Sequence, residues 1–234
     1  MRTATELPPP PPARRAASAT AVVVVASLGV IAVLSRVIDM PSSRDVTLDV
    51  AGAVGRSPDA VHAAVELATE AGVVVLVAAV LWAAWHARTA PAPLGRLLAG
   101  GIGVVAAYAG SEALKVVAAQ PRPCQELTLL VVETCPPAGD WSLPSNHAVV
   151  AVGLATALLL AVPRWWRWVV PHAVVVVVTR VALGVHYPHD VLTGALLAIV
   201  VVTGCVLVLD APARRAVAAV AAHPRLGRVL RRGS

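Results

Sequence analysis

The chain has 234 residues, of which 58% are hydrophobic and only 14% are charged, and its formal net charge is +6. A soluble domain is nearer half apolar and a quarter charged, so this composition excludes an ordinary soluble globular protein. The Val, Ala and Leu runs do not alternate with polar residues as the strands of a membrane barrel would, which predicts an all-α integral membrane protein.

The first predicted elements are a proline-rich lead and an apolar run. Residues 1–16 contain the stretch "LPPPPPA" and are expected to form a disordered lead. Residues 17–38 are long and apolar enough for a first membrane span. A signal peptide or twin-arginine export signal is the alternative for this run. The run is long for such a signal, however, and no clean cleavage site follows it.

Five more spans follow along the chain. They are predicted at residues 64–86, 97–118, 146–163, 168–185 and 190–210. The second of them is the least regular, because Glu66 and Glu70 lie near its start. The prediction is therefore a bundle of six transmembrane helices over residues 17–210. The basic residues 211–234 would form a cytoplasmic tail, which either lies along the anionic inner leaflet or is disordered.

The basic residues predict the orientation of the bundle. If both termini are cytoplasmic, only six of the 19 Lys and Arg residues fall at the outer face, namely Arg36, Arg44, Arg56, Lys115, Arg122 and Arg180. This distribution favours a plasma-membrane protein with cytoplasmic N- and C-termini. Trp165, Trp166 and Trp168 would then lie at the inner interface. Because the arginines are spread over short loops and tails, no nucleic-acid partner is expected.

The three cysteines have different predicted environments. Cys205 lies within the sixth span and is expected to be a small buried residue. Cys124 and Cys135 both lie in the loop after the third span, on the outer side, where a disulfide can form. Two free thiols are the alternative.

Polar residues gather at the predicted outer ends of four spans, from the third to the sixth. They are Lys115, Arg122, Ser145, Asn146, His147, Arg180, His186, His189 and Asp190. Three cations with few local acids, beside a helix N-terminus, suit the oxygens of a phosphoryl group. A histidine can attack phosphorus or transfer a proton near neutral pH. Asp190 follows His186 by one helical turn, so its carboxylate can orient that imidazole.

The spacing of these residues resembles the type-2 phosphatidic acid phosphatase superfamily of membrane lipid phosphate phosphatases. Its three motifs are K-x6-R-P, P-S-G-H and S-R-x5-H-x3-D. They correspond here to "KVVAAQPRP" at 115–123, "PSNH" at 144–147 and "TRVALGVHYPHD" at 179–190. The resemblance covers residues 115–190, and three ordered motifs with intact gaps are a specific signal.

The resemblance implies a role for each matching residue. His186 would be the nucleophile that forms a phosphohistidine, Asp190 would orient it, and His147 would be the general acid. The phosphate would be bound by Lys115, Arg122, Ser145, Asn146 through its backbone, and Arg180. No metal or other cofactor is expected, because the cations supply the electrostatic stabilisation. His189 lies outside the pattern and is interpreted as a neighbour that tunes the site.

Two positions depart from the family pattern. Asn146 replaces the glycine of the second motif, and Asn is the side chain that next best tolerates a positive φ. Thr179 replaces the serine of the third motif and keeps its hydroxyl. Neither change removes a catalytic group.

The predicted function is hydrolysis of a lipid phosphate or lipid diphosphate at the extracytoplasmic surface. The substrates considered are polyprenyl diphosphate, phosphatidic acid and phosphatidylglycerol phosphate, and the motifs do not separate them. One alternative is a phosphotransferase that uses an acceptor other than water. Another is a binding or transport protein for anionic lipids that performs no chemistry. The motifs also resemble those of soluble vanadate-dependent haloperoxidases, which six spans in so short a chain disfavour. The oligomeric state is not predicted.

Overall fold

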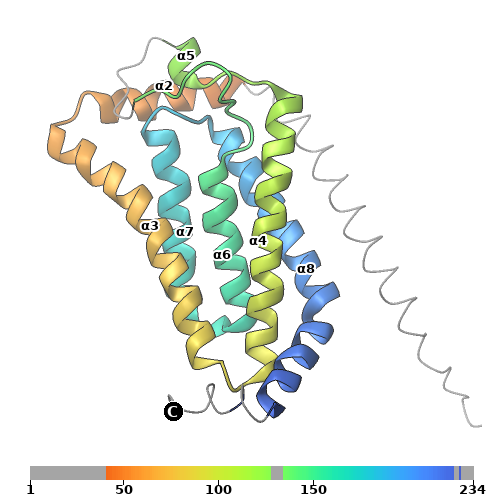
Figure 1. The fold of residues 1–234 in the computed structure, drawn as a ribbon. Helices are drawn as coiled ribbons and strands as arrows, with labels where there is room; N and C mark the ends of the chain where they lie inside the picture. The colour runs from red at the N-terminus through yellow and green to blue at the C-terminus, as the bar shows by residue number, and fades with distance from the viewer. Residues whose placement is uncertain (1–40, 128–133, 224–226, 228–234) are drawn as a thin grey trace, which may run out of the picture.

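A computed structural model describes residues 41–127, 134–223 and 227, and these residues form helices and loops without a strand. Five longer helices run roughly along one direction (Figure 1). They are α3 (Asp59–His86), α4 (Pro91–Ala118), α6 (Asn146–Ala161), α7 (Trp166–Ala182) and α8 (Pro188–Ala222). The short elements are α2 (Pro41–Gly55), α5 (Pro123–Glu126) and η1 (Pro163–Trp165). The proline-rich lead and the predicted first span lie outside the described residues.

The five later predicted spans each coincide with one of the longer helices. Among the residues that the structure describes, three segments are long and apolar enough to cross a membrane: Asp59–His86, Pro91–Glu126 and Pro188–Ala222. At 1.5 Å per residue, the 28 residues of α3 extend about 42 Å, which exceeds the roughly 30 Å of a bilayer core. Helices α6 and α7 are shorter, with 16 and 17 residues. The protein is thus all-helical over the described residues and has several apolar helices.

Small residues allow the central helices to approach closely. Helix α4 packs along both α8 and α6. A Cβ added at Gly103 of α4 would lie only 2.7 Å from the Cα of Val202 in α8, so no larger residue fits this crossing. Close contact through small residues is the usual way in which membrane helices associate, because lipid removes the hydrophobic driving force between them.

Helix α2 was not predicted and lies across one end of the bundle (Figure 1), in contact with α7 and α8. Its buried face carries Ser43, Thr47 and Ala51, one helical turn apart, whereas Val46 and Leu48 are exposed. An apolar stripe that faces a core is the usual sequence signal for such a helix. Here the buried face is small and polar, so that signal is absent.

Helix α8 continues beyond the predicted end of the sixth span. It runs through Pro212 to Ala222, so the segment predicted as a tail begins inside this helix. Asp210 pairs with Arg214 in the next turn (3.0 Å) and with Arg96 of α4 (3.9 Å). The pair with Arg96 joins α8 to the start of α4, at the end of the bundle opposite α2 (Figure 1).

Candidate active site

The predicted site residues meet at the end of the bundle that α2 covers (Figure 1). Lys115 lies in the last turn of α4 and Arg122 in the following loop. Ser145 is the N-cap of α6, and Asn146 and His147 form its first turn. Arg180 lies in the last turn of α7 and Asp190 in the first turn of α8. His186 lies between these two helices, in a loop that turns at Gly184, where a φ of +75° favours glycine.

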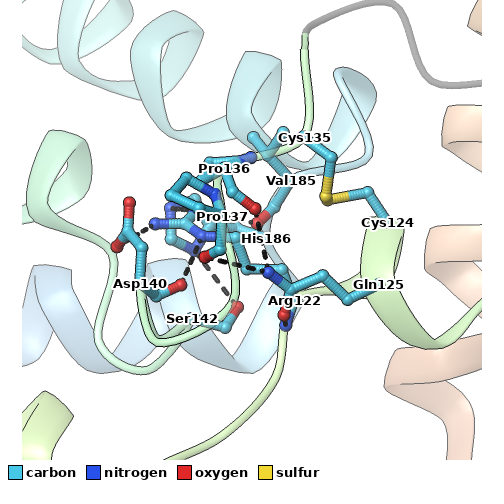
Figure 2. Close-up of a disulfide and its surroundings, with 10 residues drawn as sticks. All are labelled: Arg122, Cys124, Gln125, Cys135, Pro136, Pro137, Asp140, Ser142, Val185 and His186. Carbon is cyan, nitrogen blue, oxygen red and sulfur yellow. Dashed lines mark hydrogen bonds and ion pairs between the residues drawn. A yellow bond between two sulfur atoms is a disulfide. The ribbon is translucent and has the colours of Figure 1, made fainter.

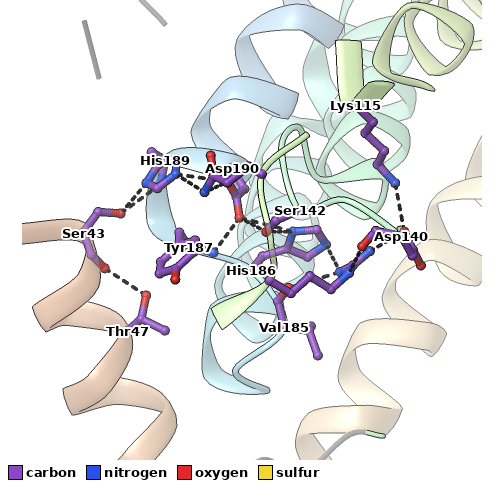
Figure 3. Close-up of polar contacts among 12 residues, drawn as sticks. Ser43, Thr47, Lys115, Asp140, Ser142, Val185, His186, Tyr187, His189 and Asp190 are labelled. Carbon is purple, nitrogen blue, oxygen red and sulfur yellow. Dashed lines mark hydrogen bonds and ion pairs between the residues drawn. The ribbon is translucent and has the colours of Figure 1, made fainter. Parts of the chain in front are cut away.

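His186 is held between the guanidinium of Arg122 (Figure 2) and the carboxylate of Asp190 (Figure 3). Arg122 Nη1 lies 3.1 Å from His186 Nε2, and because a guanidinium only donates, Nε2 is the accepting nitrogen. Nδ1 therefore carries the ring proton, and it lies 3.5 Å from Asp190 Oδ2. His186 is 2% exposed and Asp190 is fully buried. A neutral imidazole is thus oriented with Nε2 towards the cations.

Asp190 is fixed by neighbours on both sides. Its Oδ2 accepts hydrogen bonds from the Ser142 hydroxyl and from the backbone N–H of Tyr187 (2.7 Å). On the other side, His189 Nε2 lies 3.2 Å from Asp190 Oδ1, and His189 Nδ1 lies 2.8 Å from the hydroxyl of Ser43 in α2. A carboxylate held from so many directions keeps one orientation. Hydrogen bonds of this kind also offset the cost of burying a charged carboxylate.

Arg122 is buried and its guanidinium is committed to several oxygens (Figure 2). Nε donates to the backbone carbonyl of Asp140 (2.9 Å), and Nη2 donates to the Asp140 carboxylate (2.9 Å). Nη1 also donates to the carbonyl of Val185 (3.1 Å). These bonds hold the guanidinium beside His186.

Asp140 also lies 3.8 Å from the ammonium of Lys115. Its carboxylate is therefore shared by Lys115 (Figure 3) and Arg122 (Figure 2), two of the three predicted phosphate-binding cations. A carboxylate in this position contacts the groups that a phosphate oxygen would contact. Lys115 itself is 8% exposed and has a second acidic neighbour, Glu112, at 3.4 Å.

The second histidine of the site, His147, and the preceding Asn146 come from α6. His147 Nε2 lies 3.3 Å from Glu70 Oε1 of α3. The side chain of Asn146 is held by α4, since Ser111 donates to its carbonyl oxygen (2.7 Å) and its amide donates to Glu112 (2.6 Å). The side chain at the family's glycine position is thus turned towards α4.

A cavity of about 570 Å³ joins these groups. Its polar walls are formed by Glu112, Lys115, Arg122, Asp140, Asn146, His147, Arg180 and His186, and its apolar walls include Val73, Tyr108 and Val150. Ser145 is fully buried, and its hydroxyl has no hydrogen-bond partner among the described residues. Six of the eight predicted catalytic and phosphate-binding residues thus line this cavity, and a seventh, Asp190, contacts it through His186.

Comparison with known proteins agrees with this geometry. The sequence profile of the PAP2 superfamily matches residues 95–213, which include all three motifs. The chain belongs to the PAP2 superfamily. The resemblance proposed from the motifs is confirmed.

Two individual proteins resemble this PAP2 chain. An undecaprenyl-diphosphatase of Sulfolobus acidocaldarius is 39% identical over 97 residues, which are 41% of this chain and 47% of that protein. The match thus spans about half the length of this relative. A solved transmembrane PAP2-type phosphatidylglycerolphosphate phosphatase of Bacillus subtilis is 20% identical, with a TM-score of 0.55. It covers 78% of this chain and 92% of its own. At that identity the likeness shows the fold.

The charges of this PAP2 site set the protonation of its loop residues. Burial first, and then the positive charges of Arg122, Arg180 and Lys115, hold the pKa of His186 well below its usual range. Burial raises the pKa of Asp140, but hydrogen bonding and charge from Arg122, with Lys115, outweigh it, so the pKa of Asp140 is lowered. At neutral pH His186 is therefore a neutral imidazole and Asp140 a carboxylate.

Several contacting residues of the PAP2 site were missed at the sequence level. They are Ser43, Glu70, Glu112, Gln120, Asp140 and Ser142. The acids in α3 and α4 carried a usable signal, because a carboxylate in an otherwise apolar span is costly and usually functional. Ser43, Asp140 and Ser142 lie in segments of ordinary polarity and gave no such signal. Among the described residues, no group of three or more His, Cys, Asp or Glu side chains is arranged to hold a metal ion.

A disulfide joins Cys124 and Cys135 beside the site (Figure 2), with Cα atoms 5.9 Å apart. Gln125 reinforces the link, because its amide donates to the carbonyls of Pro136 (2.9 Å) and Pro137 (3.3 Å). The segment that leads to Asp140 is thereby held against the loop that carries Arg122. The remaining cysteine, Cys205, is a free thiol in α8.

Proposed function

We propose that this protein is a membrane lipid phosphatase that removes a terminal phosphoryl group through a phosphohistidine at His186. The observation that carries the proposal is the single cavity onto which Lys115, Arg122, Arg180, His147 and His186 all open. Three cations bind the phosphoryl oxygens and stabilise the charge that develops as phosphorus is attacked. An accepting Nε2 on a neutral imidazole is the form of histidine that can act as the nucleophile.

In the first step, Nε2 of His186 attacks phosphorus and the bond from phosphorus to the leaving oxygen breaks. Arg122 turns from Nε2 to the phosphoryl oxygens, which are stronger acceptors for a guanidinium. As the ring becomes cationic, the carboxylate of Asp190 stabilises the proton on Nδ1. His147 donates a proton to the leaving oxygen, so that the lipid departs as an alcohol or as a protonated phosphate.

In the second step, water attacks the phosphohistidine. The neutral His147 accepts a proton from this water, the bond from phosphorus to nitrogen breaks, and inorganic phosphate leaves. Both histidines return to their starting protonation states. The hydroxyl of Ser145 and the first N–H groups of α6 supply further donors to the phosphate.

The substrate is proposed to be a lipid phosphate or diphosphate. Val73, Tyr108 and Val150 give the cavity an apolar wall, as a substrate with a hydrocarbon chain requires. The related undecaprenyl-diphosphatase makes a polyprenyl diphosphate the first substrate to test. Phosphatidic acid and phosphatidylglycerol phosphate are the next candidates.

The proposed location is the plasma membrane, with six transmembrane helices, cytoplasmic termini and the site on the extracytoplasmic face. Arg88, Arg96, Arg164, Arg167 and Arg214 all lie at or near the helix ends that are remote from the site. The positive-inside rule supports a cytoplasmic position for that end. A disulfide at the opposite end supports an oxidising compartment on the side of the site.

The test is phosphate release by the purified protein in detergent, with a panel of lipid monophosphates and diphosphates. Wild type and His186→Ala are compared with and without chelator. The expected result is phosphate release that resists the chelator and is lost in the variant. With ³²P-labelled substrate, the wild-type protein should also retain a ³²P label that acid removes. Loss of release on chelation would contradict the metal-independent mechanism.

The alternatives are separated in the same assay. A new phosphorylated product without free phosphate would show a phosphotransferase. Lipid binding without turnover, equal in wild type and His186→Ala, would show a binding or transport protein.

A further inference from the structure

A second histidine–carboxylate pair lies across the cavity from His186. The Nε2 atom of His147 lies 3.3 Å from Oε1 of Glu70, which comes from the first half of α3. Glu70 belongs to none of the three motifs. In the predicted second span it was only an irregularity, because a carboxylate in a membrane helix is costly.

The position of Glu70 is fixed by the packing of α3 against α7. The hydroxyl of the neighbouring Thr69 is fully buried and donates to that of Thr179 (2.7 Å). A Cβ added at Gly72 would lie 2.5 Å from a methyl of Val176, so α3 approaches α7 closely at this level. Because these contacts flank Glu70, they fix the level of the α3 backbone at which the Glu70 carboxylate meets His147.

The charges around His147 explain why a carboxylate is needed there. The other charged or titratable groups on the same cavity are Glu112 and Lys115 of α4, Arg122 and Asp140 of the next loop, Arg180 of α7, and His186. Asp140 is paired with Arg122 and Lys115, and Glu112 contacts Lys115 and Asn146. The two other carboxylates of the cavity are thus in contact with Lys115, Arg122 and Asn146, and Glu70 is in direct contact with His147.

We propose that Glu70 is a positioning residue for the general acid: it accepts a hydrogen bond from Nε2–H of His147 and keeps the second proton on this ring for transfer from Nδ1. The inference rests on the proposed function. In the first step the Nδ1 proton passes to the leaving oxygen as its bond to phosphorus breaks. In the second step Nδ1 takes a proton from the attacking water. Glu70 remains a carboxylate throughout, so atoms and charges balance without another reactant.

This role makes the effect of Glu70 depend on the leaving group. Expulsion of a lipid alcohol from a monophosphate needs a proton, because an alkoxide is a poor leaving group. A diphosphate expels a lipid phosphate, and an aryl phosphate expels a phenolate, and both depart with less help. Glu70 therefore contributes most to the hydrolysis of alkyl monophosphates.

The test compares Glu70→Gln with Glu66→Gln in the full-length protein. Glu66 lies one turn earlier on α3 and lines, together with Glu70 and Arg180, a hollow of about 210 Å³. The control therefore removes the same charge from the same helix. Because the side chain of Glu70 is 72% exposed, both variants are expected to fold, which their thermal unfolding profiles check. The rates are measured against pH with an alkyl monophosphate, a lipid diphosphate and p-nitrophenyl phosphate.

We expect Glu70→Gln to lower kcat about tenfold with the alkyl monophosphate and to change KM little. The alkaline limb of its pH–rate profile should move by about one unit to lower pH, because the general acid loses its proton more easily. The loss of kcat should shrink to about twofold with p-nitrophenyl phosphate. An unmoved limb, or the same shift in Glu66→Gln, would overturn the proposal.

A double-mutant cycle with His147→Ala isolates the contact. If Glu70 acts through His147, Glu70→Gln should have no further effect on kcat in the His147→Ala background. A full tenfold loss in that background would show that Glu70 acts elsewhere and would also overturn the proposal. Absence of phosphate release by wild type would defeat the proposed function itself, whereas an active wild type with an unaffected Glu70→Gln would defeat this inference alone.

Discussion

The two histidine–carboxylate pairs of the cavity differ in their exposure to solvent. The side chains of His186 and Asp190 are 3% and 0% exposed, whereas those of His147 and Glu70 are 33% and 72% exposed. The buried pair is enclosed by Ser142, Arg122 and the start of α8, and the exposed pair joins α6 to α3.

This difference suits the two tasks proposed for the histidines. A nucleophile must keep one ring orientation while phosphorus is attacked, and burial with fixed hydrogen bonds gives that rigidity. A general acid must exchange its proton with water in each cycle, which requires access to solvent. Interactions between exposed charges are weak and screened, so the two carboxylates should contribute very unequally.

The largest expected difference is between Asp190→Asn and Glu70→Gln. We expect Asp190→Asn to lower kcat by about 10³-fold, because an amide does not stabilise the imidazolium and can stabilise the wrong tautomer. The measurement is kcat with one lipid phosphate for both variants, after a melting profile confirms that each is folded. A loss of only tenfold in Asp190→Asn would remove the distinction between the pairs.

The buried histidine should also make stability depend on pH. The pKa of His186 is depressed in the folded protein, so below about pH 6.5 the unfolded chain binds the proton more readily. The free energy of unfolding should therefore fall as pH decreases from about 6.5, by at most about 1.4 kcal/mol per pH unit, and this contribution should be constant above that pH.

The measurement for this prediction is unfolding in detergent from pH 5 to 8 for wild type, His186→Asn and His147→Asn. The slope should flatten in His186→Asn and change less in His147→Asn. Equal slopes in wild type and His186→Asn would contradict the burial of the neutral ring.

Reduction of the disulfide should affect the side of the cavity that carries Arg122. We expect KM to rise about threefold on reduction, because the Cys124–Cys135 link holds the loop of Arg122 and the segment that leads to Asp140. The alkaline limb of the pH–rate profile, which reports on His147, should stay unchanged. A thiol count must first show that the disulfide is broken. An unchanged KM would then contradict the proposal that the disulfide supports substrate binding.

The smallest expected effect is that of salt on the exposed pair. Raising the salt concentration from about 0.05 to 0.5 M should roughly halve the ratio of wild-type to Glu70→Gln rates, because exposed charges are screened. The corresponding ratio for Asp190→Asn should not change. A salt-sensitive Asp190→Asn ratio would indicate that water enters the buried pair.

The sequence predicted those parts of the molecule that depend on local composition. Long apolar runs place the helices, since lipid leaves the backbone few alternatives, and α3, α4 and α8 follow the predicted spans. The motif residues could be predicted to meet because each motif lies at a helix end, and these helix ends lie together at one end of the bundle. His147 and His186 thus share a cavity although they come from different helices.

The remaining contacts depend on how distant segments pack. Asp140 reaches Arg122 and Lys115 only because the loop after the disulfide folds back over α4. Glu70 reaches His147 only because Thr69 and Gly72 set the level at which α3 meets α7. Neither the path of a loop nor the relative level of two helices is encoded by spacing within one segment.

The close contact between α6 and α8 has a consequence for chimeric proteins. The backbone N–H of Ser145 donates to the carbonyl of Asp190 (3.1 Å), and a Cβ added at Gly194 would lie 2.6 Å from the carbonyl oxygen of Ser145. The second and third motifs are therefore packed directly against each other through their backbones. An exchange of helices between two such enzymes should carry α6 and the first two turns of α8 together, since a donor α8 with a larger residue at position 194 would push the two histidines apart.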